Sequence, residues 1–222
     1  MALAQKRRVG KKQVSTAADT RENLLRLAAR SFSTSGYTAT TMRGIAEQAG
    51  IEAASIYYHF ASKEDLVDEV MEHGAEAIVQ HLTDHLEAVA PGAGAKARFR
   101  AALIGQASAL LKYGDYAMAH GRLLSQLPEK VLDRQVKRRD HHQKLWASFL
   151  EDLRSEGLLR ADVDLALCRI YVLGFVNSVQ TWFNPKKSSL EEVVDNFCRI
   201  FFEGAGVRPA ATGNGKAKAV AG

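Results

Sequence analysis

The sequence has no long apolar run. None of its 222 residues belongs to an uninterrupted apolar stretch of about 18 or more, and no apolar segment of the secretory-signal type is present. A helix that crosses a bilayer requires about 20 mostly apolar residues. Neither membrane insertion nor secretion is indicated, so we expect a cytoplasmic protein without a membrane partner.

Cysteine is scarce as well. The chain has two cysteines, Cys168 and Cys198, and both fall inside expected helices. Chains that depend on a disulfide framework are short and contain several cysteines at close spacing. We therefore interpret the two residues as structural thiols of a core.

The sequence also lacks the signatures of common enzymes. It contains no P-loop, no GxGxxG, no HExxH and no GxSxG. The stretch 92–96, GAGAK, lacks the spacing of a P-loop and follows no expected strand. His59 has no Cys, His or acid at metal-ligand spacing. We expect neither catalysis nor a cofactor nor a bound metal.

What the sequence does contain is an uneven distribution of charge. Residues 1–63 hold 10 Lys and Arg against 4 Asp and Glu, a net charge of +6, while residues 64–222 hold 20 against 21, a net charge of −1. A basic surface confined to one end of the chain is typical of nucleic-acid binding at that end.

Part of this charge lies in an expected flexible arm over residues 1–18. Its cations are Lys6, Arg7, Arg8, Lys11 and Lys12. Such an arm lies along phosphates or in a minor groove in some DNA-binding proteins, and in other proteins it is a solvated terminus that contributes little. The sequence leaves both interpretations open.

Hydrophobic periodicity is helical throughout, without alternating strand patterns or a repeat of fixed length, so we expect an all-α protein of about nine helices. Beyond the first 61 residues the expected helices run from Ser62 to about Val89, Ala95 to Tyr113, Asp115 to Gln126, Pro128 to Glu156, Asp162 to a stop at Asn184, and Ser189 to about Glu203. The Gly- and Ala-rich tail over residues 205–222 is expected to be disordered.

Residues 40–63, TTMRGIAEQAGIEAASIYYHFASK, form the most informative stretch. Thr40 or Thr41 can cap a short helix, and Gly50 can end it in the left-handed conformation. Residues 52–60 then predict a second helix of about nine residues, on which Ile56 and Phe60 point inward. Two short helices around a Gly turn place one helix in a DNA major groove in helix-turn-helix proteins, although many other helical proteins contain such a turn.

The outer surface of this second helix would carry small, aromatic and imidazole side chains. They are Ala53, Ser55, Tyr57, Tyr58 and His59. Either tyrosine can equally be a half-buried aromatic. Ser62, with Asp65 three residues later, predicts a capping box at the start of the next helix. Lys63 would then stand at a positive helix end, where the ammonium and free N–H groups can bind a phosphate.

The segment from about Arg21 to Leu66 resembles the DNA-binding domain of the TetR family of bacterial transcriptional regulators. The matching residues are Leu24, Ala28, Phe32, Gly36, Tyr37, Thr40 to Arg43, Ile45, Ala46, Ala49 to Ile51, Ile56 to Phe60 and Ser62 to Leu66. Members commonly carry Ser and a basic residue after the turn, whereas this chain has Glu52 and Ala53. Base specificity therefore cannot be carried over at these positions.

The resemblance implies a three-helix DNA-binding domain over residues 19–62 and a helical ligand-binding and dimerisation domain over residues 63–204. It also implies a homodimer on a double-stranded DNA operator. The residues expected at the DNA are Thr40, Thr41, Arg43, Ala53, Ser55, Tyr57, Tyr58, His59 and Lys63.

The last two expected helices carry apolar stripes at helical spacing. The stripes are Val172, Phe175, Val179 and Trp182 on one helix, and Val193, Val194, Phe197, Ile200 and Phe201 on the other. Stripes of this kind are most often ordinary core. In the TetR family, however, the corresponding helices form the dimer interface. An isologous dimer would present two recognition helices to a palindromic operator with half-sites about 34–36 Å apart, or a multiple of that.

The helix over residues 128–156 is the other candidate for binding chemistry. One stripe on it, at steps of three or four residues, runs Leu132, Gln135, Arg139, His142, Trp146, Phe149 and Leu153. If Arg139 lies with this apolar face, it needs an anion, which is either an internal carboxylate or a ligand. Its charge and those of its neighbours can also reach water while their stems cover the core.

The carboxy-terminal half resembles, more loosely, TetR-type regulators of lipid and steroid catabolism that sense acyl-CoA thioesters. The residues carrying this resemblance are Arg138, Arg139, Gln143, Lys144, Trp146, Glu156, Gly157, Asp162, Asp164 and Trp182. It implies an acyl-CoA-type effector, with other hydrophobic or aromatic effectors as the alternative. The expected ligand-binding residues are Arg138, Arg139, His142, Trp146, Phe149, Phe175 and Trp182.

The sequence therefore predicts a dimeric transcriptional regulator that represses from a palindromic operator and is released by a small effector. Two alternatives are a helical protein–protein adaptor that does not bind DNA and an activator of the same fold.

Overall fold

The structure is a computed structural model that describes residues 17–116 and 123–204. All regular secondary structure in this part of the chain is helical, which confirms the all-α prediction. The elements are α1 (Ala17–Ala39), α2 (Met42–Ala49), the 3₁₀ helix η1 (Ser55–Tyr58), α3 (Lys63–Glu87), α4 (Gly94–Lys112), the 3₁₀ helix η2 (Leu124–Gln126), α6 (Glu129–Ser155), α7 (Leu165–Trp182) and α8 (Leu190–Glu203).

Three expected segments fall wholly or largely outside the described residues. They are the basic arm, except for its last two residues, the middle of the helix expected over residues 115–126, and the tail over residues 205–222. Among the helices that the structure describes, none is both long enough and apolar enough to cross a bilayer.

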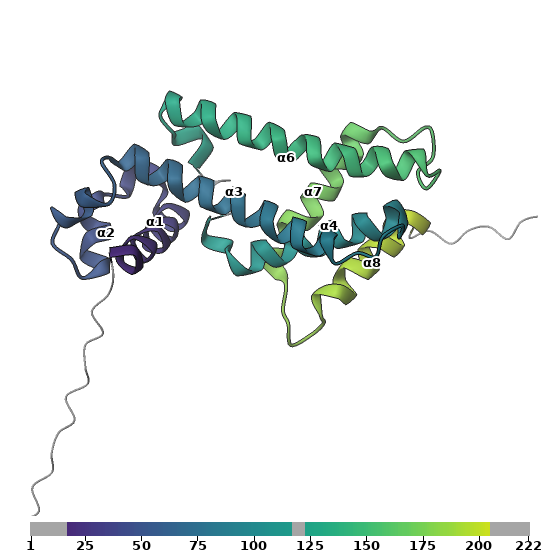
Figure 1. Cartoon of the computed structure of the whole chain (residues 1–222), viewed down its shortest axis with the longest axis horizontal. Coiled ribbons are helices and arrows are strands. Elements are labelled where there is room, and N and C mark those ends of the chain that lie inside the picture. Colours follow the sequence, from purple (N-terminus) through teal and green to yellow (C-terminus); the bar gives the residue numbers. More distant parts are fainter. Residues whose placement is uncertain (1–16, 117–122, 205–222) are drawn as a thin grey trace, which may run out of the picture.

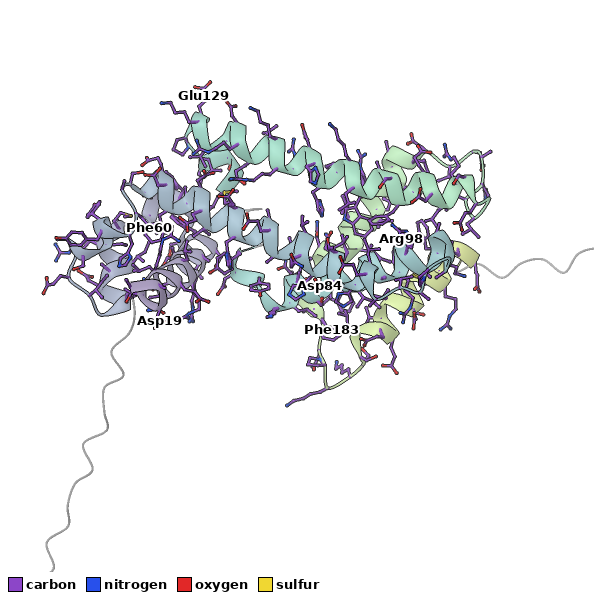
Figure 2. The ribbon with its side chains drawn as sticks, in the orientation of Figure 1. Asp19, Phe60, Asp84, Arg98, Glu129 and Phe183 are labelled. Carbon is purple, nitrogen blue, oxygen red and sulfur yellow. The ribbon has the colours of Figure 1, made fainter. Side chains whose placement is uncertain are left out.

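The helices form a small head and a larger second part joined by α3 (Figure 1). α1 and α2 lie together at one end, and α3 starts beside them and extends along α4 into the second part. α6 runs along the outside of α3, and α7 and α8 lie at the end far from α1 and α2. Asp19 and Phe60 mark the head in Figure 2, and Arg98 lies toward the opposite end.

Local signals in the sequence set several helix boundaries as predicted. The Thr41 hydroxyl accepts a 3.0 Å bond from the Gly44 N–H at the start of α2, and Gly50 ends this helix at φ 71°. Ser62 accepts from the Asp65 N–H at the start of α3, but the predicted capping box is incomplete there, because the Asp65 carboxylate accepts from the Ser62 hydroxyl and not from the Ser62 N–H. Ser189 and Glu192 form a full capping box at α8. These side chains satisfy N–H groups that a helix start leaves without intrahelical partners.

The predicted start of α7 at Asp162 is wrong by two residues. Asp164 is the N-cap, and its Oδ1 accepts from the N–H groups of Ala166 and Leu167 at 2.8 and 3.1 Å. Asp162 instead accepts from the Arg160 guanidinium, which lowers the pKa of the Asp162 carboxyl. Both aspartates have a capping side chain, and the arginine two residues upstream engages the first of them.

Buried apolar side chains form two clusters, one in the head and one in the second part. The head cluster is built on Leu24, Phe32, Ile45, Ile56 and Leu66, and Tyr116, Leu123 and Val131 join it from later in the chain. The second cluster includes Phe99, Trp146, Val176, Val194 and both cysteines, which are free thiols. Burial raises the pKa of the Cys198 thiol to about 11, as expected of a structural cysteine. α3 contributes to both clusters and so connects them physically.

Candidate nucleic-acid interface

The segment expected to be the recognition helix is shorter and tighter than predicted. Residues 52–60 do not form a nine-residue α-helix, because only Ser55–Tyr58 are helical and their bonds follow the i to i+3 pattern. The N–H of Ser55 donates to the Glu52 carbonyl at 2.8 Å, and that of His59 to the Ile56 carbonyl at 3.0 Å. The β-branched, aromatic and imidazole residues here are weak helix formers, and burial of Ile56 and Phe60 holds the segment against the head core.

Two large aromatic side chains project from this segment into solvent. Tyr57 is 56% exposed and Tyr58 is 89% exposed. Tyr58 is therefore not a core residue, and Tyr57 is buried only in part. Both rings are thus available for contact with a partner at the basic end of the chain. Ala53, Ser55 and His59 on the same segment are partly exposed.

The two threonines before α2 have different roles. Thr41 is exposed and caps the helix, whereas Thr40 is only 4% exposed and its hydroxyl donates to the Gly36 carbonyl at 2.8 Å. The Thr40 side chain therefore serves the fold and is not available to DNA. Arg43 is well exposed, and its ion pair with Glu47 one turn later is a surface pair of the kind that contributes little.

Lys63 lies at the first position of α3, as predicted, and is surrounded by groups that the sequence analysis did not assign to it. Its ammonium is 4.2 Å from the centroid of the Tyr37 ring and 3.5 Å from the Thr38 carbonyl. The Tyr37 hydroxyl donates to Glu64 at 2.8 Å. Desolvation lowers the pKa of Lys63, and desolvation together with the Glu64 bond raises that of Tyr37 to about 12.

The residues predicted to bind an effector are divided between the second core, the contact of α6 with α3 and the surface. Trp146 and Phe149 are buried in the second core. The Trp146 Nε1–H donates to the Gln106 Oε1 at 2.7 Å, and the His142 Nε2 lies 2.8 Å from the same oxygen. Gln106 is itself buried and donates to Asn177 at 2.9 Å. Gln106 is a member of this polar network that the sequence alone does not reveal, because only the fold brings α4 against α6.

Of the two neighbouring arginines in the middle of α6, Arg138, and not Arg139 as predicted, faces the rest of the protein. Arg139, expected in line with the apolar face, is exposed. Arg138 is the inward one: its guanidinium lies 3.1 Å from Asp68 and 2.6 Å from Glu72 on α3. Arg134 also pairs with Asp68, at 2.7 Å. The anion required near this stripe is therefore internal, and the acids of α3 that supply it are 66 or more residues away in sequence.

Gln135 lies within the same contact between α3 and α6. Its Nε2 donates to Asp68 at 2.9 Å, while its Oε1 is buried without a hydrogen-bond partner among the described residues. A buried acceptor of this kind costs about 1–3 kcal/mol. This half of α6 is thus held to the rest of the protein both by polar contacts with α3 and by the packing of Val131 in the head core.

The last two predicted ligand residues lie on α7. The Phe175 ring stacks on Phe197 of α8 with centroids 3.9 Å apart. Trp182 is half exposed, and its Nε1–H donates to Ser178 on its own helix.

Two surface grooves of about 310 and 500 Å³ lie along the acidic face of α3 and between α4 and α8. Within the described residues, no group of three or more His, Cys, Asp or Glu could hold a metal ion.

Comparison with known proteins matches both parts of the chain. Residues 24–70 match the family model for bacterial regulatory proteins of the tetR family, and residues 92–205 match the model for the tetracyclin repressor-like C-terminal domain. The HTH-type transcriptional repressor KstR2 of Mycolicibacterium smegmatis is 30% identical over 192 residues, which cover 84% of this chain and 91% of the relative.

Two solved structures have a similar fold. The ketosteroid transcriptional regulator KstR2 of Mycobacterium tuberculosis superposes with a TM-score of 0.72 at 25% identity, covering 86% of this chain and 96% of the other. AibR in complex with isovaleryl coenzyme A and operator DNA has a TM-score of 0.70 at 20% identity, covering 82% and 98%. The resemblance inferred from residues 21–66 is confirmed, and the chain belongs to the tetR family of bacterial regulatory proteins, which are DNA-binding transcriptional regulators and not enzymes.

Proposed function

We propose that this protein is a transcriptional repressor that binds a palindromic operator as a homodimer and is released by a small effector. The observation that carries DNA binding is the exposed pair Tyr57 and Tyr58, which projects from the helix-turn-helix segment at the basic end of the chain. Residues 19–62 would bind DNA, and residues 63–204 would bind the effector and the second protomer. Its chromosomal target would keep the protein in the cytoplasm.

The DNA-binding surface in this proposal keeps most of the residues expected from the sequence. They are Thr41, Arg43, Ala53, Ser55, Tyr57, Tyr58, His59 and Lys63. The small residues Ala53 and Ser55 let the backbone approach base edges, while hydroxyl and cationic groups bind phosphates. Thr40 is left out because its side chain is buried.

Replacing Lys63 with Ala should weaken binding to operator and to random duplex by a similar factor. A phosphate contact is independent of sequence, so the slope of log affinity against log salt should fall by about 0.9 on both duplexes. Fluorescence anisotropy titrations at several salt concentrations measure this slope. Lys96→Ala is the matched control, because Lys96 lies on α4 over Phe202 in the second part. An unchanged slope for Lys63→Ala would remove the residue from the interface.

The homodimer is proposed to form through the outer face of α7 with α8. Leu167, Ile170, Tyr171 and Ile200 are large, apolar and exposed. Gly174 lies among them in the middle of α7, and a Cβ added there would meet no described atom within 4 Å beyond its chain neighbours and the backbone of its own helix. A mid-helix Gly costs about 1 kcal/mol relative to Ala, so its presence at an open position is explained by the close approach of a partner helix.

Gly174→Arg should therefore convert the dimer to a monomer at micromolar concentration, because a long charged side chain would separate the two α7 helices. Sedimentation equilibrium measures the shift in mass. Ser148→Arg, an equally exposed position on α6, is the control and should leave the mass unchanged. If Gly174→Arg remains a dimer, the interface lies on another surface.

An acyl-CoA thioester is the proposed effector class. Support comes from the relatives: KstR2 is named a ketosteroid regulator, and AibR was solved with isovaleryl coenzyme A. In this chain the Arg138 guanidinium is paired with Asp68 and Glu72, so it would bind a phosphate only after both carboxylates move away from it. His142 lies one turn further along the same face. Exposed Arg139 is not kept in this site.

One experiment tests the three parts together. Duplexes bound by the protein are selected from a random pool, and the selection is repeated with candidate thioesters. We expect a palindrome with regularly spaced half-sites and loss of binding with one thioester class. A helical adaptor would select no duplex and give no salt slope. A reporter gene behind the selected operator distinguishes repression from activation.

A further inference from the structure

The first turn of α3 presents an electrostatic problem for the phosphate site proposed there. Lys63 is followed directly by Glu64 and Asp65, so two carboxylates accompany one ammonium at this helix start. Carboxylates near a helix N-terminus stabilise the helix, but a carboxylate near a phosphate repels it. If this turn binds a phosphate, both carboxylates have to be kept away from it.

The cap itself holds Asp65. Its Oδ2 accepts from the Ser62 hydroxyl at 2.8 Å, and its N–H donates to the same Ser62 oxygen at 3.0 Å. This arrangement closes within the turn and needs no other residue. Hydrogen bonds from the backbone and from the Ser62 side chain also reach the Glu64 carboxylate, and the Tyr37 hydroxyl on α1 donates to it at 2.8 Å.

Tyr37 is fixed in place from several directions. It follows Gly36, whose φ of 80° lies in the left-handed region of backbone conformation that favours glycine. Its own N–H donates to the Gln126 Oε1 at 3.0 Å. One face of its ring lies toward Phe32, with nearly parallel planes and centroids 6.2 Å apart, and the Lys63 ammonium lies 4.2 Å from its centroid. The ring and the hydroxyl therefore act on neighbouring residues of opposite charge.

We propose that Tyr37 is a positioning residue for DNA binding, whose ring supports the Lys63 ammonium and whose hydroxyl holds the Glu64 carboxylate away from the bound phosphate. The inference rests on the proposed function of this end of the chain. The directions of the pKa shifts agree with this pairing: burial and the hydrogen bond to Glu64 raise the pKa of Tyr37 to about 12, and hydrogen bonds from the backbone and from Tyr37 lower the pKa of Glu64.

The test uses Tyr37→Phe, which keeps the ring and its packing and removes only the hydroxyl. Duplex affinity near 0.1 M salt should fall about fivefold, the effect of one carboxylate brought to within about 4 Å of a phosphate in water. Adding Glu64→Gln should restore affinity to at least the wild-type level, because the freed side chain is then neutral. Glu87→Gln, at the far end of the same helix, is the control and should restore nothing.

The outcomes separate this inference from the function on which it rests. If wild-type protein binds no duplex, the proposed function fails and the inference fails with it. If wild-type protein binds but Tyr37→Phe binds equally well, the inference alone is overturned. It is also overturned if Tyr37→Phe lowers the melting temperature and affinity together and Glu64→Gln does not restore affinity, since Tyr37 would then be structural only.

Discussion

Replacing Trp146 with Ala should lower the free energy of unfolding by about 3–5 kcal/mol, the usual range for removing a buried Trp. The side chain is 0% exposed and packs edge-on against Phe99 and Phe149, with centroids 6.1 and 5.6 Å away. Its loss would also leave the buried Gln106 oxygen without the 2.7 Å bond from the indole. Both effects destabilise the second core, and denaturation in urea measures their sum.

Arg139→Ala is the matched control on the same helix. Arg139 is exposed one residue from the inward-facing Arg138, so its loss should change the unfolding free energy by less than about 0.5 kcal/mol. Trp146→Phe should give an intermediate loss, since it keeps most of the ring packing but removes the indole N–H. If Trp146→Ala kept full stability and lost only the effector response, the residue would line a pocket, as the sequence suggested.

Trp146 is buried and Arg139 is exposed, although the sequence periodicity places both on one stripe of α6. Two stripes at steps of three and four residues end at Trp146. One starts at Leu132 and contains Arg139, and the other starts at Val131 and contains Arg138. Val131 and Leu132 are both apolar, and Arg138 and Arg139 are identical, so the sequence alone does not choose. The structure selects the stripe through Val131 and Arg138 because Asp68 and Glu72 of α3 face that side.

Local features, by contrast, could be predicted well. The all-α fold, the caps at Thr41, Ser62 and Ser189 and the Gly50 terminator all depend on contacts within a few residues. The recognition segment shows the limit of this approach. Ile56 and Phe60 face inward as their spacing predicts, but the choice of a 3₁₀ turn over an α-helix is made by packing on the head core.

The candidate DNA-binding site was predicted less completely than the fold. The sequence identified Lys63 and the exposed tyrosines of the recognition segment. It did not identify the contact of Tyr37 with Lys63 and Glu64, which joins residues 26 or 27 positions apart. No periodicity relates residues on α1 to the first turn of α3. Only the packing of the head places the aromatic ring under the ammonium.

Gly105→Val should destabilise the protein by about 1–3 kcal/mol through overpacking between α3 and α4. A Cβ at Gly105 would lie 2.8 Å from the His81 carbonyl oxygen and 2.8 Å from the Leu82 Cα. Both are backbone atoms of α3 and cannot rotate away. Even Gly105→Ala should be destabilising, although Ala favours a helix by about 1 kcal/mol over Gly. Gly114→Ala, where the nearest atom lies at 3.8 Å, is the control and should be neutral.

Gly105→Ala also tests whether α3 transmits a displacement to the head, where DNA binding is proposed. Leu82 belongs to the second core, whereas Leu66, Val67, Val70 and Met71 belong to the head core, so one continuous helix connects the two. If α3 moves as a rigid body, pushing it at Leu82 shifts Lys63, and Gly105→Ala should lower operator affinity about threefold or more under conditions where it remains folded. Reduced stability with unchanged operator affinity would mean that α3 bends between Met71 and Leu82. An effector bound in the second part would then have to act on the head through α6 and its contacts with Asp68.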